Sequence, residues 1–188
     1  MDIARYVDML RTGAVVACPT ETQMGLMADA LNDVAVDRVC AMKKRPAGEP
    51  IPLIVPSLEA AVAIARDLSA DAVQLASAHW PGPLTLVMRA QGRLPDTVLK
   101  DGTVAVRVPG PSPALELVTA FGGPLTATSA NLSGQPPLSD VAELEATFGD
   151  ALAGVVPGEV PGGAPSTLVD VTGPQPVVLR QGPVKIDD

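Results

Sequence analysis

Aromatic residues are nearly absent from this 188-residue sequence, which contains one Trp, one Tyr and two Phe. Hydrophobic residues nonetheless make up 47% of the chain, so the core must be built from Val, Leu, Ile and Ala. A chain of this length buries roughly 70% of the surface that its unfolded form exposes. We therefore expect a single domain over residues 1–188. The scarcity of aromatic side chains also leaves few surfaces on which nucleic-acid bases could stack.

Cysteine and histidine are also scarce. Cys18 and Cys40 lie far apart with no CxxC pair, and His79 is the sole histidine. The sequence thus offers no His/Cys metal cluster, and we predict no metal-ligating residues. Both cysteines are expected to be buried thiols in a reducing cytoplasm, although a disulfide between them stays open at this stage. We expect His79, which precedes Trp80, to have a packing role.

The sequence lacks both a long apolar run and an excess of basic residues. Residues 1–19 carry acids early and only the short apolar run AVVAC, unlike a signal peptide or a membrane span. Thirteen Lys and Arg against 21 Asp and Glu give a net charge of −8. This charge disfavours attraction of the whole surface to a membrane or to nucleic acid. A cluster of basic residues in such an acidic protein therefore indicates a specific local role.

Helical and strand patterns alternate along the chain. Helices are predicted after caps at Asp2, Asp33 and Ser57 (the last carrying Leu58 to Ala65), over residues 70–79, after Pro113 and from near Ser139. Strands are predicted at residues 14–18, 52–55, 85–88, 103–108, 124–128, 154–156, 166–171 and 176–180. This order indicates an α/β protein, and the absence of a helix between the last two strands favours a mixed sheet. The Gly/Pro-rich segment 157–165 is expected to be a mobile flap beside a site.

Basic residues recur at the ends of predicted elements. Residues 43–45 (KKR) precede Pro46, Arg107 precedes Pro109, and Arg180 precedes Gly182. Ligands of open α/β sheets bind at strand ends, and an arginine that ends an apolar run needs an anionic partner. That partner is either one of the 21 acids, in a structural ion pair, or a polyanion such as a nucleotide triphosphate.

The segment GGPLTATSANLSG, residues 122–134, is rich in hydroxyl groups. A turn with such side chains holds phosphate oxygens or a small polar substrate, or is simply a capped turn. The phosphate-binding motifs GxxxxGK[ST] and GxGxxG are absent. From the residues alone, the sequence indicates an anion-binding α/β domain.

Seven segments together resemble the YrdC family of threonylcarbamoyl-AMP synthases, in the same order and with similar spacing. They are PTETQMGL (19–26), KKRP (43–46), WPGPLTLVM (80–88), VAVRVP (104–109), TATSANLSG (126–134), STLVDV (166–171) and VVLRQG (177–182). The resemblance implies a twisted mixed α/β sheet flanked by helices, with a large concave basic cavity, and it points to the single-domain branch. It also implies a nucleotidyltransferase that makes threonylcarbamoyl-AMP and pyrophosphate from L-threonine, bicarbonate and ATP, for threonylcarbamoyladenosine formation on tRNA.

The resemblance assigns roles to individual residues. Lys43 and Arg45 are implied to be the catalytic cations that meet the ATP phosphates, and Mg²⁺ is expected to accompany ATP. The positions implied to bind threonine are Thr22, Arg107, Ala127 and Ser166. The further positions implied for the nucleotide are Thr103, Ser129, Asn131 and Arg180. Transient contact with tRNA-modification proteins is also implied, with weak or no direct binding of nucleic acid.

Three positions depart from the family pattern. Met24 stands where an aromatic residue is usual, Glu49 where many members have Asn, and Ile54 where a histidine is common. Met24 leaves open a non-catalytic RNA-binding or ribosome-associated relative of the same fold. A carbamoyl-transfer domain like that of hydrogenase-maturation proteins is a second alternative, which the two cysteines disfavour because those proteins carry zinc-finger-like segments.

Overall fold

The computed structural model describes residues 2–186, and each of its α-helices begins at a side-chain cap. An Asp, Asn or Ser side chain accepts a hydrogen bond from the backbone N–H three residues further on, as Asp2 does from Arg5 and Ser57 from Ala60. Such caps stabilise a helix by about 1 kcal/mol. The helices are α1 (Ile3–Arg11), α2 (Asp33–Lys43), α3 (Leu58–Ile64), α4 (Ala70–His79), α5 (Pro113–Phe121) and α6 (Val141–Phe148), with 3-10 turns η1 (Asp96–Val98) and η2 (Gly149–Ala151).

Three predicted helix ends are wrong by one or two residues. Asn32, not Asp33, caps α2, because Asn32 has the extended backbone of a cap while Asp33 is already helical. Asp140 caps α6, one residue after the predicted start near Ser139. Ala65 does not belong to α3, since it begins the short strand β4 (Ala65–Arg66) that pairs with β5 (Leu84–Ala90).

The strands form two sheets. The smaller has the order β10-β1-β2-β9, and the larger has the order β12-β11-β5-β7-β3-β8 with β4 paired to β5 and β6 to β7. Strand β11 runs parallel to β5 and antiparallel to β12, which confirms the mixed sheet. The remaining bounds are β1 (Val16–Pro19), β2 (Met24–Met27), β3 (Leu53–Ile54), β5 (Leu84–Ala90), β6 (Leu99–Lys100), β7 (Thr103–Arg107), β8 (Leu125–Thr126), β9 (Thr128–Ser129), β10 (Gly154–Val155), β11 (Thr167–Asp170) and β12 (Val177–Arg180).

The segment predicted as one strand over residues 124–128 is two strands in two different sheets. Strand β8 pairs with β3 of the larger sheet, and β9 pairs with β2 of the smaller one. The chain crosses between the sheets at Ala127, whose N–H bonds the Pro52 carbonyl. Thr126 secures the crossing, because its hydroxyl donates to the Leu26 carbonyl and accepts from the Ala28 N–H. The hydroxyl-rich segment therefore lies at the junction of the two sheets.

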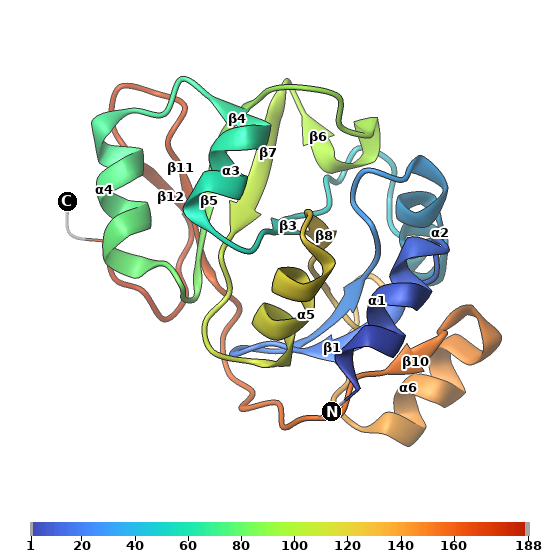
Figure 1. Cartoon of the computed structure of the whole chain (residues 1–188). Helices are drawn as coiled ribbons and strands as arrows, with labels where there is room; N and C mark the ends of the chain where they lie inside the picture. The colour runs from blue at the N-terminus through green and yellow to red at the C-terminus, as the bar shows by residue number, and fades with distance from the viewer. Residues whose placement is uncertain (1, 187–188) are drawn as a thin grey trace.

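Helices cover the sheets on their outer sides (Figure 1). Helix α4 packs on β5 and α3 on β4, while α1 and α5 pack against each other and on β1. Strands β1 and β2 are buried along their whole length, and the core consists mostly of Val, Leu, Ile, Ala and Met, as the scarcity of aromatic residues required.

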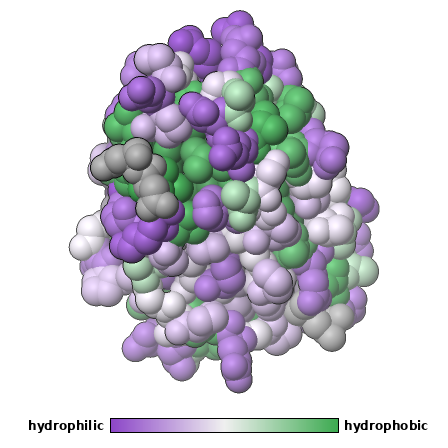
Figure 2. All heavy atoms as spheres, turned by 90° about the vertical axis from the view of Figure 1, so that its left-hand side faces the viewer, coloured by the Kyte–Doolittle hydropathy of each residue, from purple (hydrophilic) through white to green (hydrophobic). Residues whose placement is uncertain are grey.

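The surface carries some exposed apolar side chains, and Figure 2 shows several of them in the upper half of one face. Val177 and Leu179 of β12 are 56% and 55% exposed. None of the helices formed by residues 2–186 has the length and apolar content of a membrane span. Both cysteines are free thiols: Cys18 is buried as predicted, but Cys40 is only half-buried.

Candidate functional site

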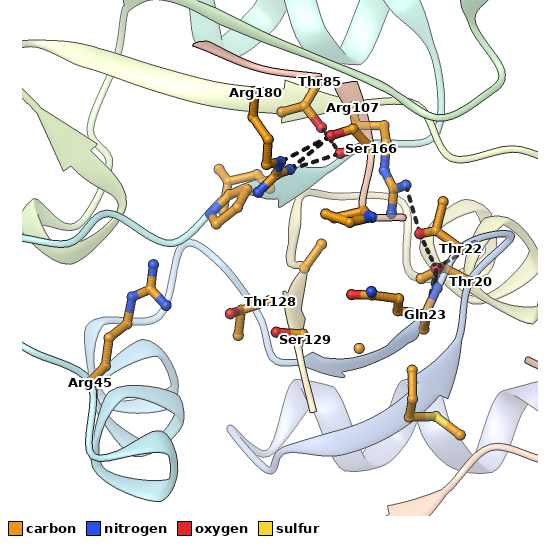
Figure 3. Close-up of a pocket in the computed structure, with 16 residues that line it drawn as sticks. Thr20, Thr22, Gln23, Arg45, Thr85, Arg107, Thr128, Ser129, Ser166 and Arg180 are labelled. Atoms are coloured by element: carbon orange, nitrogen blue, oxygen red, sulfur yellow. Dashed lines mark hydrogen bonds between the residues drawn. The ribbon is translucent and has the colours of Figure 1, made fainter. Parts of the chain in front are cut away.

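A cavity of about 190 Å³ is lined by residues from both sheets. The turn between β1 and β2 contributes one wall, and Ala127, Thr128 and Ser129 contribute another. Three arginines reach the cavity from distant parts of the chain: Arg45 after α2, Arg107 at the end of β7 and Arg180 at the end of β12. Figure 3 shows Arg45 on the opposite side of the cavity from Arg107 and Arg180. The site is therefore small, polar and strongly cationic.

A second cavity of about 700 Å³ adjoins the first and shares Arg45, Pro52, Thr85 and Arg180 with it. Its floor is the face of the larger sheet, where Val87, Ala105, Leu168 and Leu179 are apolar. Polar and charged residues, among them Thr103, surround this floor. A volume of this size is typical of a pocket for a small organic ligand or cofactor.

Arg107 is almost fully buried, with 6% of its surface exposed. Its Nη1 donates to Glu21 Oε1 over 3.0 Å and to Thr22 Oγ1 over 3.4 Å. Burial lowers the pKa of the Arg107 guanidinium, and the charge of Arg180 lowers it further, while the Glu21 carboxylate opposes both effects. Nη1 is the one guanidinium nitrogen of Arg107 that bonds to residues within 2–186. The rest of the group lies at the cavity wall, where it can meet an anion.

Ser166 connects Arg180 to Thr85. The Ser166 carbonyl accepts from Arg180 Nε (3.2 Å) and Nη2 (2.9 Å), and the Ser166 hydroxyl lies 2.7 Å from the Thr85 hydroxyl. Thr85 and Ser166 are both buried, and Thr85 lines both cavities. Figure 3 shows this group of three side chains next to Arg107.

Arg45 is held by the loop that follows it. Its Nε donates to the Glu49 carbonyl (3.0 Å) and its Nη2 to the Pro50 carbonyl (2.8 Å), and Glu49 Oε2 lies 3.9 Å from Nη2. The Glu49 side chain is 55% exposed, so it is a solvated neighbour of Arg45 and not a buried charge. These contacts fix Arg45 where both cavities meet.

The Lys43 side chain is bonded within the protein, whereas Arg45 lines both cavities. Lys43 is 2% exposed, and its Nζ donates to Ser129 O (2.5 Å), Asn131 O (3.0 Å) and Asn131 Oδ1 (2.7 Å). A lysine ammonium has three donors, so all three are already bonded within the protein. Burial and the charge of Arg45 lower the pKa of Lys43 to about 8. Of the three cations implied to meet the nucleotide, Arg45 and Arg180 line both cavities, whereas Lys43 is bonded behind the wall that contains Ser129.

Asn131 lines neither of these two cavities. Its Oδ1 accepts from Lys43 and from the Ser129 hydroxyl, and its Nδ2 donates to the Gln135 carbonyl. In this structure Asn131 holds the turn together, and its contact with the nucleotide stays a prediction. Ser129 lines the smaller cavity, but its hydroxyl donates to Asn131.

The other predicted site residues lie in the walls of the cavities. Thr22, Ala127 and Ser166 line the smaller one, and Thr103 lines the larger one. Met24 also lines the smaller cavity while being 2% exposed, and Ile54 is a fully buried core residue. Pro165, at the end of the predicted flap, lines the smaller cavity, and Gln23 Nε2 donates to the carbonyl of Gly163 in the same segment.

The sequence interpretation missed Thr20, Thr85 and Glu21. Thr20 binds the Thr22 hydroxyl (3.0 Å) and shapes the turn between β1 and β2. Thr85 could have been noticed, because it is a polar residue inside the otherwise apolar segment LTLVM. The role of Glu21 could not be recognised from the local sequence, because its partner Arg107 lies 86 residues away.

The chain belongs to the Sua5/YciO/YrdC family, whose profile, described as telomere recombination, matches residues 8–182. Two similar proteins are called threonylcarbamoyl-AMP synthase. The one from Vibrio cholerae (classical strain O395) is 41% identical over 96% of this chain and 97% of its own length. The one from Pyrococcus abyssi is 39% identical over 95% of this chain but only 53% of its own length, so this chain spans about half of that relative.

A solved structure agrees with the fold. The crystal structure of P. abyssi Sua5 complexed with L-threonine has a TM-score of 0.89 and 37% identity, over 96% of this chain and 54% of the other. The family resemblance read from the seven segments is therefore confirmed, together with the mixed α/β architecture.

Proposed function

We propose that this protein is a threonylcarbamoyl-AMP synthase, which converts L-threonine, bicarbonate and ATP to threonylcarbamoyl-AMP and pyrophosphate. The observation that carries the proposal is the pair of adjoining cavities that share Arg45, Thr85 and Arg180. One is small and polar and the other is large with an apolar floor, as required for an amino acid and a nucleotide that must react with each other.

L-Threonine fits the smaller cavity. The accessible part of the Arg107 guanidinium would receive its carboxylate, since arginine pairs with carboxylates through two parallel hydrogen bonds. Thr22, Ala127 and Ser166 lie in the same walls. A related protein was crystallised with L-threonine, which supports this placement.

ATP fits the larger cavity, with its base over the apolar face of the sheet and its phosphates toward Arg45 and Arg180. Thr103 lines this cavity. The two arginines lie where the α-phosphate would meet the threonine side, because they line both cavities.

The chemistry needs positioning and charge stabilisation, without a covalent nucleophile. The threonine amine and bicarbonate form a carbamate with loss of water. A carbamate oxygen then attacks the α-phosphorus, the bond from this phosphorus to the bridging oxygen breaks, and pyrophosphate leaves. Arg45 and Arg180 would stabilise the charge that develops on the phosphate oxygens. Lys43 would act through Ser129 and Asn131, by fixing a wall of the smaller cavity.

Magnesium is compatible with the residues of the larger cavity. Glu49, Asp101 and Asp170 lie in its walls, while residues 2–186 contain no group of three or more His, Cys, Asp or Glu side chains arranged to hold a metal. Mg²⁺ commonly binds through one or two carboxylates and the substrate phosphates, so Glu49 beside Arg45 is the residue that would help to hold it. Mg²⁺ supplies charge neutralisation of the triphosphate.

Binding of RNA is the less favoured alternative. The net charge is −8, and recognition of unpaired RNA bases commonly uses aromatic stacking, which this sequence hardly provides. The names of the related proteins also favour the synthase. Transient contact with other tRNA-modification proteins and a cytoplasmic location belong to the same proposal.

The test is to incubate the protein with ATP, Mg²⁺, bicarbonate and either L-threonine or another amino acid, and to measure pyrophosphate. We expect release that requires both threonine and bicarbonate. Release that is absent, or indifferent to threonine, would refute the proposal, and binding of double-stranded RNA at physiological salt would then favour the alternative.

A further inference from the structure

A buried carboxylate lies against Arg107, outside the lining of the smaller cavity. The side chain of Glu21 is 15% exposed, and its Oε1 bonds Arg107 Nη1 over 3.0 Å. Its other oxygen, Oε2, is buried without any hydrogen-bond partner. Buried polar atoms nearly always have a partner, because an unpaired one carries a desolvation cost. Among residues 2–186 the Glu21 carboxylate is therefore compensated only through Oε1, and because Glu21 does not line the cavity its charge acts on a ligand there through space.

We propose that Glu21 determines substrate specificity: with Arg107 it forms a paired-charge corner that selects zwitterionic amino acids over acids without an α-amine. This inference rests on the proposed binding of threonine in the smaller cavity. Arg107 would meet the carboxylate, and the charge of Glu21 would favour the ammonium group, which carries three donors.

The charges around the cavity explain why such a residue is needed. The side chains that line this cavity within residues 2–186 include three arginines and no Asp or Glu. Three guanidinium groups at one small site attract any small anion. Glu21, placed directly behind Arg107, introduces a negative charge at low dielectric, where charges interact more strongly than in water. The carboxylate of a ligand is attracted by Arg107 and repelled by Glu21. An ammonium group on the same ligand is attracted by Glu21, which offsets that repulsion.

Gly110 provides the space in which Glu21 lies. A Cβ atom at position 110 would lie 3.0 Å from Glu21 Cγ and 3.4 Å from its Cβ and Cδ. Gly110→Ala would therefore displace the Glu21 side chain relative to Arg107 by a few tenths of an ångström without changing any charge, which gives a test independent of substitution at Glu21 itself.

The experiment compares two ligands by titration calorimetry: L-threonine, and 3-hydroxybutanoate, which is threonine without its amine. The variants are Glu21→Gln, Gly110→Ala and, as a matched control that also removes one acid, Glu143→Gln on the exposed face of α6. We expect the natural protein to bind threonine at least tenfold more tightly than 3-hydroxybutanoate. Glu21→Gln should reduce this ratio about tenfold, equivalent to about 1.4 kcal/mol, by weakening the binding of threonine and strengthening the binding of 3-hydroxybutanoate.

Gly110→Ala should change the ratio in the same direction by a smaller factor, and Glu143→Gln should leave it unchanged. An unchanged ratio in folded Glu21→Gln protein, or an equal loss for both ligands, would show that Glu21 is merely structural and overturn the proposal. If Glu21→Gln does not fold, the same criterion applies to Gly110→Ala. Failure of the natural protein to bind threonine would instead refute the proposed function, and with it this inference.

Discussion

Lys43 and Arg107 are both buried cations at the end of an element, yet they are bonded in different ways. Lys43 ends α2 and is 2% exposed, with three hydrogen bonds from its ammonium to Ser129 and Asn131. Arg107 ends β7 and is 6% exposed, with one nitrogen bonded to Glu21 and Thr22. The lysine has no donor left for a ligand, while the arginine faces the cavity with donors to spare.

Burial alone therefore does not distinguish a binding cation from a structural one. Both charges are desolvated, and in both residues burial is the main cause of a lowered pKa. The distinction lies in how many donors the protein itself satisfies. A cation with all donors bonded holds its partners in place, and a cation with free donors at a cavity wall is suited to bind an anion.

The largest effect is expected for Arg107→Ala, which removes the binding cation. Loss of one partner from a buried charge pair costs on the order of 2 to 5 kcal/mol, equivalent to a roughly 30- to 4000-fold higher Kd for threonine. The requirement for ATP should change far less. Arg107→Lys should restore only part of the affinity, because an ammonium cannot make the two-pronged contact of a guanidinium. Calorimetric titration of threonine and of ATP measures both effects.

Arg107→Ala also leaves the Glu21 carboxylate without its partner, so thermal unfolding must be recorded beside the titration. A folded Arg107→Ala protein that binds threonine normally would show that the Glu21–Arg107 pair is structural only. Arg107 would then be a structural cation like Lys43, and its unbonded donors would have no role in binding threonine.

A smaller effect, on stability, is expected for Lys43→Met. The substitution leaves the Asn131 carbonyl without its donor, at a cost of about 1–3 kcal/mol, whereas the Ser129 carbonyl still accepts from the Asn131 N–H and Asn131 Oδ1 still accepts from the Ser129 hydroxyl. It also relieves the desolvation of the ammonium. We expect a net loss of about 2 kcal/mol in the free energy of unfolding, with the neighbouring exposed Lys44→Met as a control. Threonine affinity of the folded variant should fall less than for Arg107→Ala. A variant of natural stability that has lost ATP binding would identify Lys43 as a direct phosphate ligand.

The pH dependence of stability provides a second readout for Lys43. Its pKa is lowered from 10.5 to about 8, so between these values the unfolded chain binds more protons than the folded protein. The contribution of this group therefore makes the free energy of unfolding rise with pH across that window, by at most about 1.4 kcal/mol per pH unit. The difference between the natural protein and Lys43→Met isolates this contribution.

Local features of the fold followed from the sequence, and features that depend on distant residues did not. The caps at Asp2 and Ser57 and the helix over residues 70–79 are set by neighbouring residues, and all three were predicted. The split of residues 124–128 between two sheets depends on pairing with β3 and β2, which no local pattern encodes.

The candidate site shows the same limit. The sequence placed cations at the ends of elements, and two arginines do converge where the cavities meet. What each cation bonds to was not predictable, because Asn131 lies 88 residues from Lys43 and Glu21 lies 86 residues from Arg107. A cation at the end of an element thus proved to be bonded within the protein in one case and to line the cavity in the other.

The smallest effect is expected for Thr85→Val, which tests a neutral hydrogen bond beside these charges. Valine keeps the shape of threonine but removes the hydroxyl that lies 2.7 Å from Ser166 Oγ. Ser166 also accepts two hydrogen bonds from Arg180 through its carbonyl, and these remain in the variant. The loss of one neutral hydrogen bond costs about 1 kcal/mol, or roughly fivefold in Kd.

Because Thr85 lines both cavities, the affinities for threonine and ATP should fall by similar factors, in contrast to Arg107→Ala. Separate calorimetric titrations with the two ligands check this, and a loss confined to one of them would mean that Thr85 serves a single cavity.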